Sequence, residues 1–251
     1  MMRTFLATLA TAGLASAYSH PRDRQRPLGM SSSTSSLNDG TQTKIIYLIR
    51  HGQAYNNLGH FDWLDPNLTD LGLDQAKKLG QEWRESDDVE LVVSSPQIRA
   101  LNTTFTWLTG ATERNITFPN FIEKPIIAFP ELQELGSSPS SRGHLREDLE
   151  DMLGHPPPFP VYLGRLTPDW NTTTGYWERD QASSIVRAKI FKLWLADREE
   201  RRIAVVGHDA NLNLLVNSTC FRDHRHRCRH WHNTEVRYFH FDGDRFHELD
   251  G

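Results

Sequence analysis

Three short apolar runs in this chain are each followed by arginine or histidine. These basic residues are Arg50 and His51 after residues 45–49, Arg99 soon after residues 91–93, and His208 after residues 203–206. Short apolar runs rich in β-branched residues are typical of buried strands. In open α/β sheets the carboxyl ends of parallel strands meet at one edge, where ligands bind. We therefore expect these arginines and histidines to lie close together and to bind an oxyanion.

Helices are predicted beside these strands and would hold them in place. One helix should begin near Pro96, because Ile98, Leu101, Phe105 and Leu108 follow at helical spacing. The same spacing predicts two more helices, one with Leu73, Ala76, Leu79 and Trp83 after a Thr69 N-cap, and one with Ile185, Ala188, Phe191 and Leu195. The first of these helices would pack against the sheet by its apolar face.

Four motifs resemble those of the histidine phosphatase superfamily, in its phosphoglycerate-mutase-like branch. In the family's chain order they are Arg50-His51-Gly52-Gln53 with Asn57, Leu68-Thr69-Asp70-Leu71-Gly72 with Gln75-Ala76, Ser94-Ser95-Pro96 with Arg99-Ala100, and Gly207-His208. The resemblance spans roughly residues 44–240. It implies a three-layer α/β/α sandwich with a mostly parallel central sheet and a cap inserted above the active site.

The resemblance also implies a role for each motif residue. His51 would be the nucleophile that becomes phosphorylated, and Arg50 and Arg99 would clamp the phosphate. His208 would stabilise the transition state, and Asn57 would add a hydrogen bond to the phosphate. No metal and no other cofactor are expected, because two arginines and two histidines can carry the charge.

Two carboxyl groups compete for the role of proton donor. Glu134 stands where this branch carries the acid that protonates the leaving group and then activates water, and Glu131 is its near neighbour. Asp209 is the alternative, because the acid-phosphatase branch takes its proton donor from a His-Asp pair. That branch also expects arginine and proline soon after Arg-His-Gly, and residues 54–56 contain neither. We therefore prefer Glu134.

The expected activity is hydrolysis of a phosphomonoester of a small phosphorylated metabolite through a phosphohistidine intermediate. A phosphoglycerate-type mutase is one alternative, but mutases place Arg and Tyr-Gly directly after the acidic residue, where this chain has Leu-Gly-Ser-Ser at 135–138. A non-catalytic protein that binds phosphorylated ligands is the other, and the complete set of motif residues disfavours it. The formal net charge of −4 gives no indication of a nucleic-acid partner.

The amino terminus predicts a signal peptide over residues 1–17. A basic start precedes an apolar stretch, and Ala15-Ser16-Ala17 fits the small-x-small cleavage pattern. The apolar stretch is too short for a stable membrane span. Five glycosylation sequons favour the secretory pathway, at Asn67, Asn102, Asn115, Asn171 and Asn217. A mitochondrial presequence is the alternative, since no acidic residue precedes Asp23.

The remaining chain divides into a leader and one catalytic domain. Residues 18–43 are rich in Pro, Arg and Ser and predict a flexible leader, whereas residues 44–251 would form the domain. Its cap, around residues 130–180, is the expected source of substrate choice.

Near the carboxyl terminus, Cys220 and Cys228 flank a segment rich in arginine and histidine. In an oxidising compartment the two cysteines could form a local disulfide, and two free thiols are the alternative. His224 and three further histidines suggest a metal site, but the neighbouring arginines would repel a cation. We expect instead a basic rim that attracts an anionic substrate.

Overall fold

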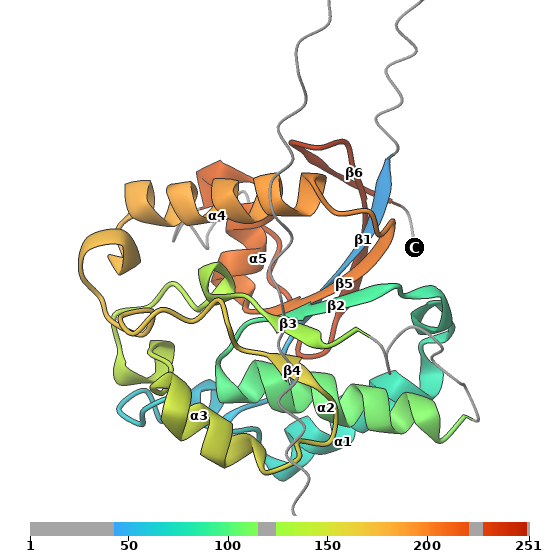
Figure 1. Cartoon of the computed structure of the whole chain (residues 1–251), viewed down its shortest axis with the longest axis horizontal. Helices are drawn as coiled ribbons and strands as arrows, with labels where there is room; N and C mark the ends of the chain where they lie inside the picture. Colours follow the sequence, from blue (N-terminus) through green and yellow to red (C-terminus); the bar gives the residue numbers. More distant parts are fainter. Residues whose placement is uncertain (1–42, 115–123, 221–227, 250–251) are drawn as a thin grey trace, which may run out of the picture. The chain divides into compact units, whose positions relative to one another are not determined.

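In the computed structural model, which describes residues 43–114, 124–220 and 228–249, seven strands form the central sheet (Figure 1). Their order across the sheet is β4-β3-β2-β5-β1-β6-β7. The strands are β1 (Lys44–Arg50), β2 (Leu91–Ser94), β3 (Ile126–Ala128), β4 (Val161–Tyr162), β5 (Arg202–Gly207), β6 (Val236–Phe241) and β7 (Phe246–Glu248). The first five in this order pair in parallel, and β6 and β7 are antiparallel. The predicted mostly parallel sheet is confirmed.

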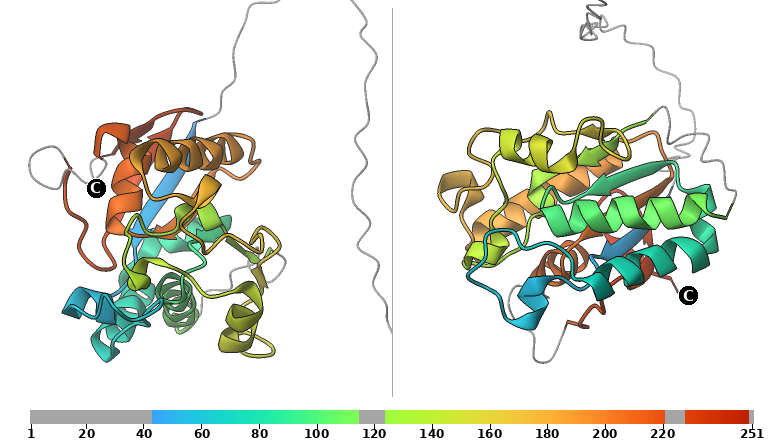
Figure 2. Two further views of the ribbon diagram at one scale, coloured as in Figure 1. Left: turned by 90° about the vertical axis from the view of Figure 1, so that its left-hand side faces the viewer. Right: turned by 90° about the horizontal axis from the view of Figure 1, so that it is seen from below.

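Helices cover both faces of the sheet, which makes a three-layer sandwich (Figures 1 and 2). Successive side chains of β1 point to opposite faces, so that Tyr47 and Ile49 join one apolar core and Ile46 and Leu48 join the other. The helices on the first face are α1 (Asp70–Glu82), α2 (Ile98–Thr112) and α3 (Arg146–Leu153). Those on the second face are α4 (Gln181–Ala196) and α5 (Asp209–Val216).

Strand register brings the motif residues to one edge. Arg50, the last residue of β1, lies opposite Gly207 of β5. Ser94, the last residue of β2, lies opposite Val206 on the other side of β5. The three strands therefore end level with one another, as the sequence predicts.

The predicted helix after Pro96 is present, and its four predicted apolar residues are all buried. The helix predicted after Thr69 is also present, and the Thr69 hydroxyl accepts a hydrogen bond from the Gly72 N–H, as an N-cap does. The prediction is wrong for Leu73, however, which is exposed. The buried face of α1 includes Gly80 instead. There the helix lies so close to α2 that an added Cβ would be 2.1 Å from the Trp107 carbonyl oxygen.

Residues 130–180, the predicted cap, contain α3 and much irregular chain. One part of this range belongs to the sheet, since Val161 of β4 pairs with Ile126 of β3. The short 3-10 helices of the molecule are η1 (Tyr55–Leu58), η2 (Arg84–Asp88), η3 (Pro130–Leu132), η4 (Pro139–Ser141), η5 (Gly175–Trp177) and η6 (Ser218–Cys220). Three of them, η3 to η5, fall in this range, and that the range acts as a cap stays a prediction.

Candidate active site

The two motif histidines and Arg99 meet at the carboxyl edge of the sheet. The rings of His51 and His208 lie with their centroids 5.0 Å apart. The Arg99 Nε–H donates to His51 Nε2 at 3.4 Å. All three side chains are buried, and so is Arg50 next to His51. The expected cluster is thus present, and the catalytic role of each member stays a prediction.

The ring of His51 is held in one tautomer. Its Nδ1 lies 2.6 Å from the carbonyl oxygen of Gly52, which can only accept, so Nδ1 carries the proton. Nε2 therefore keeps its lone pair. Burial lowers the pKa of His51 well below 6.5, and the charges of Arg99 and Arg50 lower it further. The result is a neutral imidazole, the form that can act as a nucleophile.

Arg99 is anchored by Asp65, a residue that the sequence reasoning missed. The Arg99 Nη1 donates to Asp65 Oδ1 at 3.1 Å and to the Ser140 carbonyl at 3.0 Å. Asp65 also accepts from the Ile98 N–H at 3.0 Å, at the start of α2. Its φ of 40° lies in the left-handed region, an uncommon conformation for a residue other than glycine. Burial raises the pKa of Asp65 to about 7, against the opposing effect of Arg99.

Asp209 belongs to a chain of hydrogen bonds that leads to Arg50. Its Oδ2 accepts from His230 Nδ1 at 2.7 Å, and His230 Nε2 faces Arg50 Nη1 at 3.3 Å. Its Oδ1 accepts from the Trp231 N–H and from the amide of Asn213. Arg50 Nη1 also donates to the Trp231 carbonyl. Asp209 is thus placed to orient Arg50, and three donors occupy its carboxylate.

Glu134 lies beside His208 instead. Its Oε2 is 3.9 Å from His208 Nδ1, and its Oε1 accepts from the Leu135 N–H at 2.9 Å. Arg179, another residue that the sequence reasoning missed, donates to the backbone carbonyl of Glu134. Burial raises the pKa of Glu134, so the carboxyl keeps its proton to higher pH. A carboxyl of that kind is suited to act as a general acid.

Glu131, the near neighbour of Glu134, faces a different part of the chain. Its Oε1 accepts from the hydroxyl of Tyr176 at 3.1 Å, inside the predicted cap. The geometry therefore separates the two glutamates and leaves Glu134 as the one at the histidines.

His208 is neutral, and its Nε2 lies 2.9 Å from the Ser95 hydroxyl. Burial lowers the pKa of His208 well below 6.5, with further contributions from Arg99 and His51. If the Ser95 hydroxyl donates to Nε2, Nδ1 carries the proton. Among the described residues, His208 Nδ1, Arg99 Nη2 and Arg50 Nε have no hydrogen-bond partner, although all three are buried. Oxygens of a phosphoryl group would satisfy such donors.

Asn57 has a local contact in this structure. Its Oδ1 accepts from the Ala54 N–H at 3.0 Å and closes the turn after the motif. Asn233, which the sequence reasoning also missed, donates to the His51 carbonyl at 3.0 Å and lies 3.4 Å from Asn57 Oδ1. The predicted hydrogen bond from Asn57 to phosphate stays a prediction.

Glycines bring the first turn of α1 against the loop that follows His51. A Cβ on Gly72 would lie 1.9 Å from the Gln53 carbonyl oxygen, and a Cβ on Gly52 would lie 2.6 Å from the Gly72 carbonyl oxygen. The Gly52 N–H donates to the Thr103 hydroxyl of α2 at 3.0 Å. This wall of the site is therefore backbone packed directly on backbone.

The segment around the two cysteines is closed by a Cys220–Cys228 disulfide, with the Cα atoms 5.6 Å apart. Of the two alternatives for the cysteines, the structure thus contains the disulfide. His224 lies outside the described residues, as does the core of the predicted basic rim. Within the part of the chain that the structure describes, no group of three or more His, Cys, Asp or Glu side chains could hold a metal ion.

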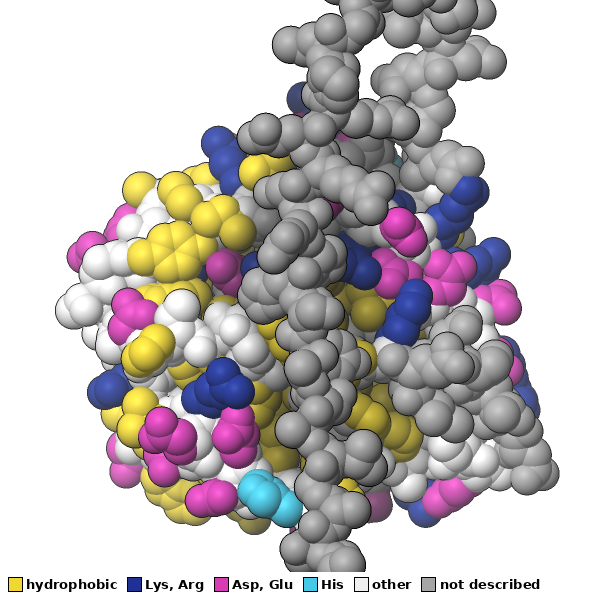
Figure 3. Space-filling view, viewed as in Figure 1, with side chains coloured by type: hydrophobic (Ala, Val, Ile, Leu, Met, Phe, Trp, Pro, Cys, Tyr) yellow, Lys and Arg dark blue, Asp and Glu magenta, His cyan; other side chains and the backbone are white. Residues whose placement is uncertain are grey.

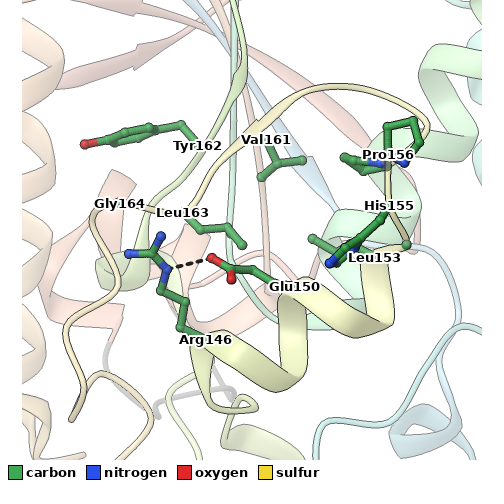
Figure 4. Close-up of a pocket in the computed structure, with 11 residues that line it drawn as sticks. Arg146, Glu150, Leu153, His155, Pro156, Val161, Tyr162, Leu163 and Gly164 are labelled. Carbon is green, nitrogen blue, oxygen red and sulfur yellow. Dashed lines mark hydrogen bonds and ion pairs between the residues drawn. The ribbon is translucent and has the colours of Figure 1, made fainter. Parts of the chain in front are cut away.

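A cavity of about 460 Å³ lies between α3 and β4 (Figure 4). Arg146 and Glu150 on its wall form an ion pair at 2.8 Å, and the other lining residues include Leu153, His155 and Val161. None of the predicted site residues is among the described residues that line it. The cavity is therefore separate from the histidine cluster.

Comparisons with known proteins agree with the motifs. The sequence model of the histidine phosphatase superfamily (branch 1) matches residues 46–150. Over 233 residues the chain is 28% identical to phosphoglycerate mutase-like protein 1 of Arabidopsis thaliana, a match that covers 77% of this chain and 79% of that protein.

Two solved structures are similar in fold. The ecdysone phosphate phosphatase of Bombix mori, in complex with tungstate, has a TM-score of 0.55 and 14% identity, covering 83% of this chain and 92% of that one. The protein YhfR of Bacillus stearothermophilus has a TM-score of 0.52 and 21% identity, covering 81% of this chain and 94% of that one. These likenesses support the α/β architecture described above.

Proposed function

We propose that this chain, whose residues 46–150 match the histidine phosphatase superfamily, hydrolyses a phosphomonoester of a small metabolite through a phosphohistidine on His51. The observation that carries this proposal is the state of His51. Its Nδ1 proton is held by the Gly52 carbonyl, its Nε2 faces Arg99, and burial keeps the ring neutral. A buried neutral imidazole between two guanidinium groups is suited to attack phosphorus.

In the first step, His51 Nε2 attacks phosphorus and the bond from phosphorus to the leaving oxygen breaks. Arg50, Arg99 and the Nδ1–H of His208 would bind the equatorial phosphoryl oxygens, where negative charge accumulates. Glu134 would give its proton to the leaving oxygen, which departs as an alcohol.

In the second step, the ionised Glu134 would take a proton from water, and that water attacks the phosphohistidine. The bond between phosphorus and Nε2 breaks, which releases inorganic phosphate and restores neutral His51. Glu134 ends protonated, so that one carboxyl serves both steps and no other proton carrier is needed.

Hydrolysis is favoured over the two alternatives. A mutase would need groups that hold a returning sugar acid after Glu134, and here Leu135 is buried and residues 136–138 are Gly-Ser-Ser. A non-catalytic binding protein would have no use for a general acid with a raised pKa beside the histidines.

The test of this proposal is capture of the phosphoenzyme. Protein quenched during turnover of a ³²P-labelled phosphomonoester should carry label that is lost in acid and stable in base. The His51→Ala variant should show neither the label nor turnover. Label that persists in the variant would exclude His51 as the nucleophile, and binding of phosphate without turnover in the parent would favour the binding protein.

We further propose that the protein enters the secretory pathway through a signal peptide at residues 1–17, with a mitochondrial presequence as the alternative. The Cys220–Cys228 disulfide supports this, because disulfides persist in oxidising compartments. The sequon residues Asn67 and Asn217 are exposed, so both could accept a glycan. Within the described residues, no helix combines the length and the apolar character needed to cross a membrane.

Expression in a eukaryotic host tests this location. We expect protein in the medium that begins after Ala17 and that shifts to lower mass when treated with an endoglycosidase. Retention in mitochondria with no glycan would favour the alternative.

A further inference from the structure

Exposed hydrophobic side chains gather on the loop that follows the nucleophile. Leu58, Phe61, Trp63 and Leu64 are 55%, 57%, 45% and 47% exposed, and all four lie within seven residues. In both views of Figure 2 this loop, drawn in blue, lies at the periphery of the molecule. Single exposed hydrophobic residues are ordinary, whereas a cluster of them marks a binding surface. We call these four residues the apolar loop patch.

Aromatic contacts hold part of the patch in shape. The Trp63 ring lies 4.3 Å from the His60 ring at an interplanar angle of 32°, and 5.3 Å from the Tyr55 ring. A tryptophan that is fixed by two neighbouring rings can receive a ligand without losing further conformational freedom.

Both ends of this loop are tied to the phosphate-binding groups. At its start, Ala54 pairs with Leu68 only three residues after His51. At its end, Asp65 binds Arg99 at 3.1 Å, directly after the last residue of the patch. Between these ends, the Phe61 carbonyl accepts from the Ser140 N–H at 3.1 Å, and the Ser140 carbonyl accepts from Arg99. The loop that carries the patch is therefore joined at several points to residues of the candidate active site.

Charge on the loop limits what it can bind. Residues 54–68 contain no lysine or arginine, and their charged residues are Asp62 and Asp65. A second phosphate or a carboxylate on the substrate would find no cation here and would meet the exposed Asp62. An uncharged hydrocarbon group would instead gain from burial against the four side chains.

We propose that the alcohol part of the substrate is apolar, an aliphatic or aromatic group, and that it packs on the apolar loop patch while its phosphate is held by Arg50 and Arg99. This inference rests on the proposed phosphatase activity and names its substrate class as phosphomonoesters of hydrophobic alcohols. Phe61 and Trp63 would then determine specificity.

The test is a series of unbranched alkyl phosphates from ethyl to octyl, assayed below their micelle-forming concentrations. The leaving alcohols differ little in acidity along this series, so that differences in kcat/KM report binding of the chain. We expect kcat/KM to rise by about two- to fourfold per methylene, because a fully buried methylene corresponds to roughly fourfold.

Two variants test whether the alkyl chain binds the apolar loop patch or any exposed hydrophobic side chain. In Phe61→Ser/Trp63→Ser the ratio of the octyl to the ethyl value should fall to about one. The hydrogen bond from the Ser140 N–H goes to the backbone carbonyl of Phe61, so it does not depend on the Phe61 side chain and should survive the substitution. Leu193→Ser is the matched control, because Leu193 is 68% exposed on α4, where Figure 3 shows other hydrophobic side chains. Leu193 lies in the last turn of α4, which leads to the amino end of β5, whereas the site lies at the carboxyl ends of the strands. The octyl-to-ethyl ratio of Leu193→Ser should therefore equal that of the parent.

Each outcome has one meaning. A parent that is active on every ester with no dependence on chain length overturns this inference and leaves the phosphatase activity in place. A parent with no turnover of any phosphomonoester overturns the proposed function itself. If the double variant keeps the chain-length dependence but loses sedimentation with phosphatidylcholine vesicles, the patch binds a lipid surface and the inference is wrong.

Discussion

At the scale of single residues, burial governs the chemistry of the site. His51 and His208 are buried next to arginines, and both effects disfavour their protonated forms. Burial has the opposite effect on the pKa of Glu134, because there the neutral form is the protonated one. The same burial thus keeps the imidazoles neutral, each with one N–H and one lone pair, and keeps the carboxyl protonated as a possible proton donor.

This arrangement predicts the behaviour of the site histidines in acid. In NMR titrations of ¹⁵N-labelled protein, the ring signals that disappear in His51→Ala and in His208→Ala should stay those of neutral imidazole as the pH falls through 6.5. In urea-unfolded protein, where burial is absent, all histidines should titrate near their ordinary pKa of about 6.5. Protonation of the His51 signal at or above pH 6.5 in the folded protein would contradict the electrostatic description.

The choice between Glu134 and Asp209 predicts a dependence on the leaving group. A general acid matters most for a poor leaving group, so Glu134→Gln should slow alkyl phosphates at least tenfold more than aryl phosphates. Each tenfold difference corresponds to about 1.4 kcal/mol of transition-state stabilisation. Asp209→Asn should slow both types alike, since Asp209 acts through His230 on Arg50. The reverse pattern would assign the proton to Asp209.

The buried pair of Asp65 and Arg99 predicts a loss of stability when Asp65 is replaced. Asp65→Asn leaves Arg99 buried without its counter-ion, and breaking such a pair costs about 3 kcal/mol. Asparagine tolerates the positive φ at this position, so the backbone should be retained. Urea unfolding above pH 8, where Asp65 with its pKa of about 7 is ionised, measures the effect, and the exposed Asp62→Asn is the control. Equal unfolding free energies for the two variants would show that the pair contributes nothing.

At the scale of elements, the segment after the disulfide holds one side of the site. Cys228 is two residues from His230, which contacts Arg50. The disulfide closes the short loop after η6 and so limits where this segment can lie.

Removal of the disulfide should therefore weaken both the fold and phosphate binding. Cys220→Ser/Cys228→Ser should lower the free energy of unfolding by about 2–3 kcal/mol. It should also raise KM for a small phosphomonoester more than it lowers kcat, because Arg50 loses support. Dithiothreitol should reproduce both changes in the parent and leave the double variant unaffected. An unchanged KM would show that Arg50 is held without this loop.

Sequence patterns predicted the elements whose signals are local. The strands before Arg50 and His208 are apolar runs, and α2 has an apolar face at helical spacing, so both could be predicted. Strand β4 has two residues, too few to show a pattern, and its membership of the sheet depends on pairing with β3. Leu73 fits the helical spacing but is exposed, because the buried face of α1 is formed by Gly72, Ala76 and Gly80, and Leu73 lies beside that face.

The same distinction applies to the site. Arg50, His51, Arg99 and His208 stand at strand ends and in motifs, where sequence alone is informative. Asp65 acts through a contact across 34 positions of the chain and lies on a loop without periodicity, so no local signal marks its partner. His230 is likewise defined by its position between Asp209 and Arg50, which only the folded chain creates.

At the scale of the whole molecule, the positive charge of the site comes from the chain itself. Arg50 and Arg99 lie beside His51, so activity should not depend on a divalent cation. We expect dialysis against EDTA to leave kcat/KM on a small phosphomonoester unchanged within about twofold. A large loss that added zinc or magnesium restores would show that a metal takes part.

The glycine contact between the loop that follows His51 and α1 also bears on how this protein can change. Neither Gly52 nor Gly72 can accept even a methyl group without displacing backbone that carries His51. Substitutions at either glycine should therefore abolish activity and so cannot alter which substrate is hydrolysed. We expect new specificities, whether they arise by natural divergence or by laboratory selection, to come instead from residues 58–64 and 135–145. A mutagenesis library confined to those two segments should yield far more active clones with altered preference than a library of equal size built on residues 52–54 and 69–72, which leaves His51 unchanged.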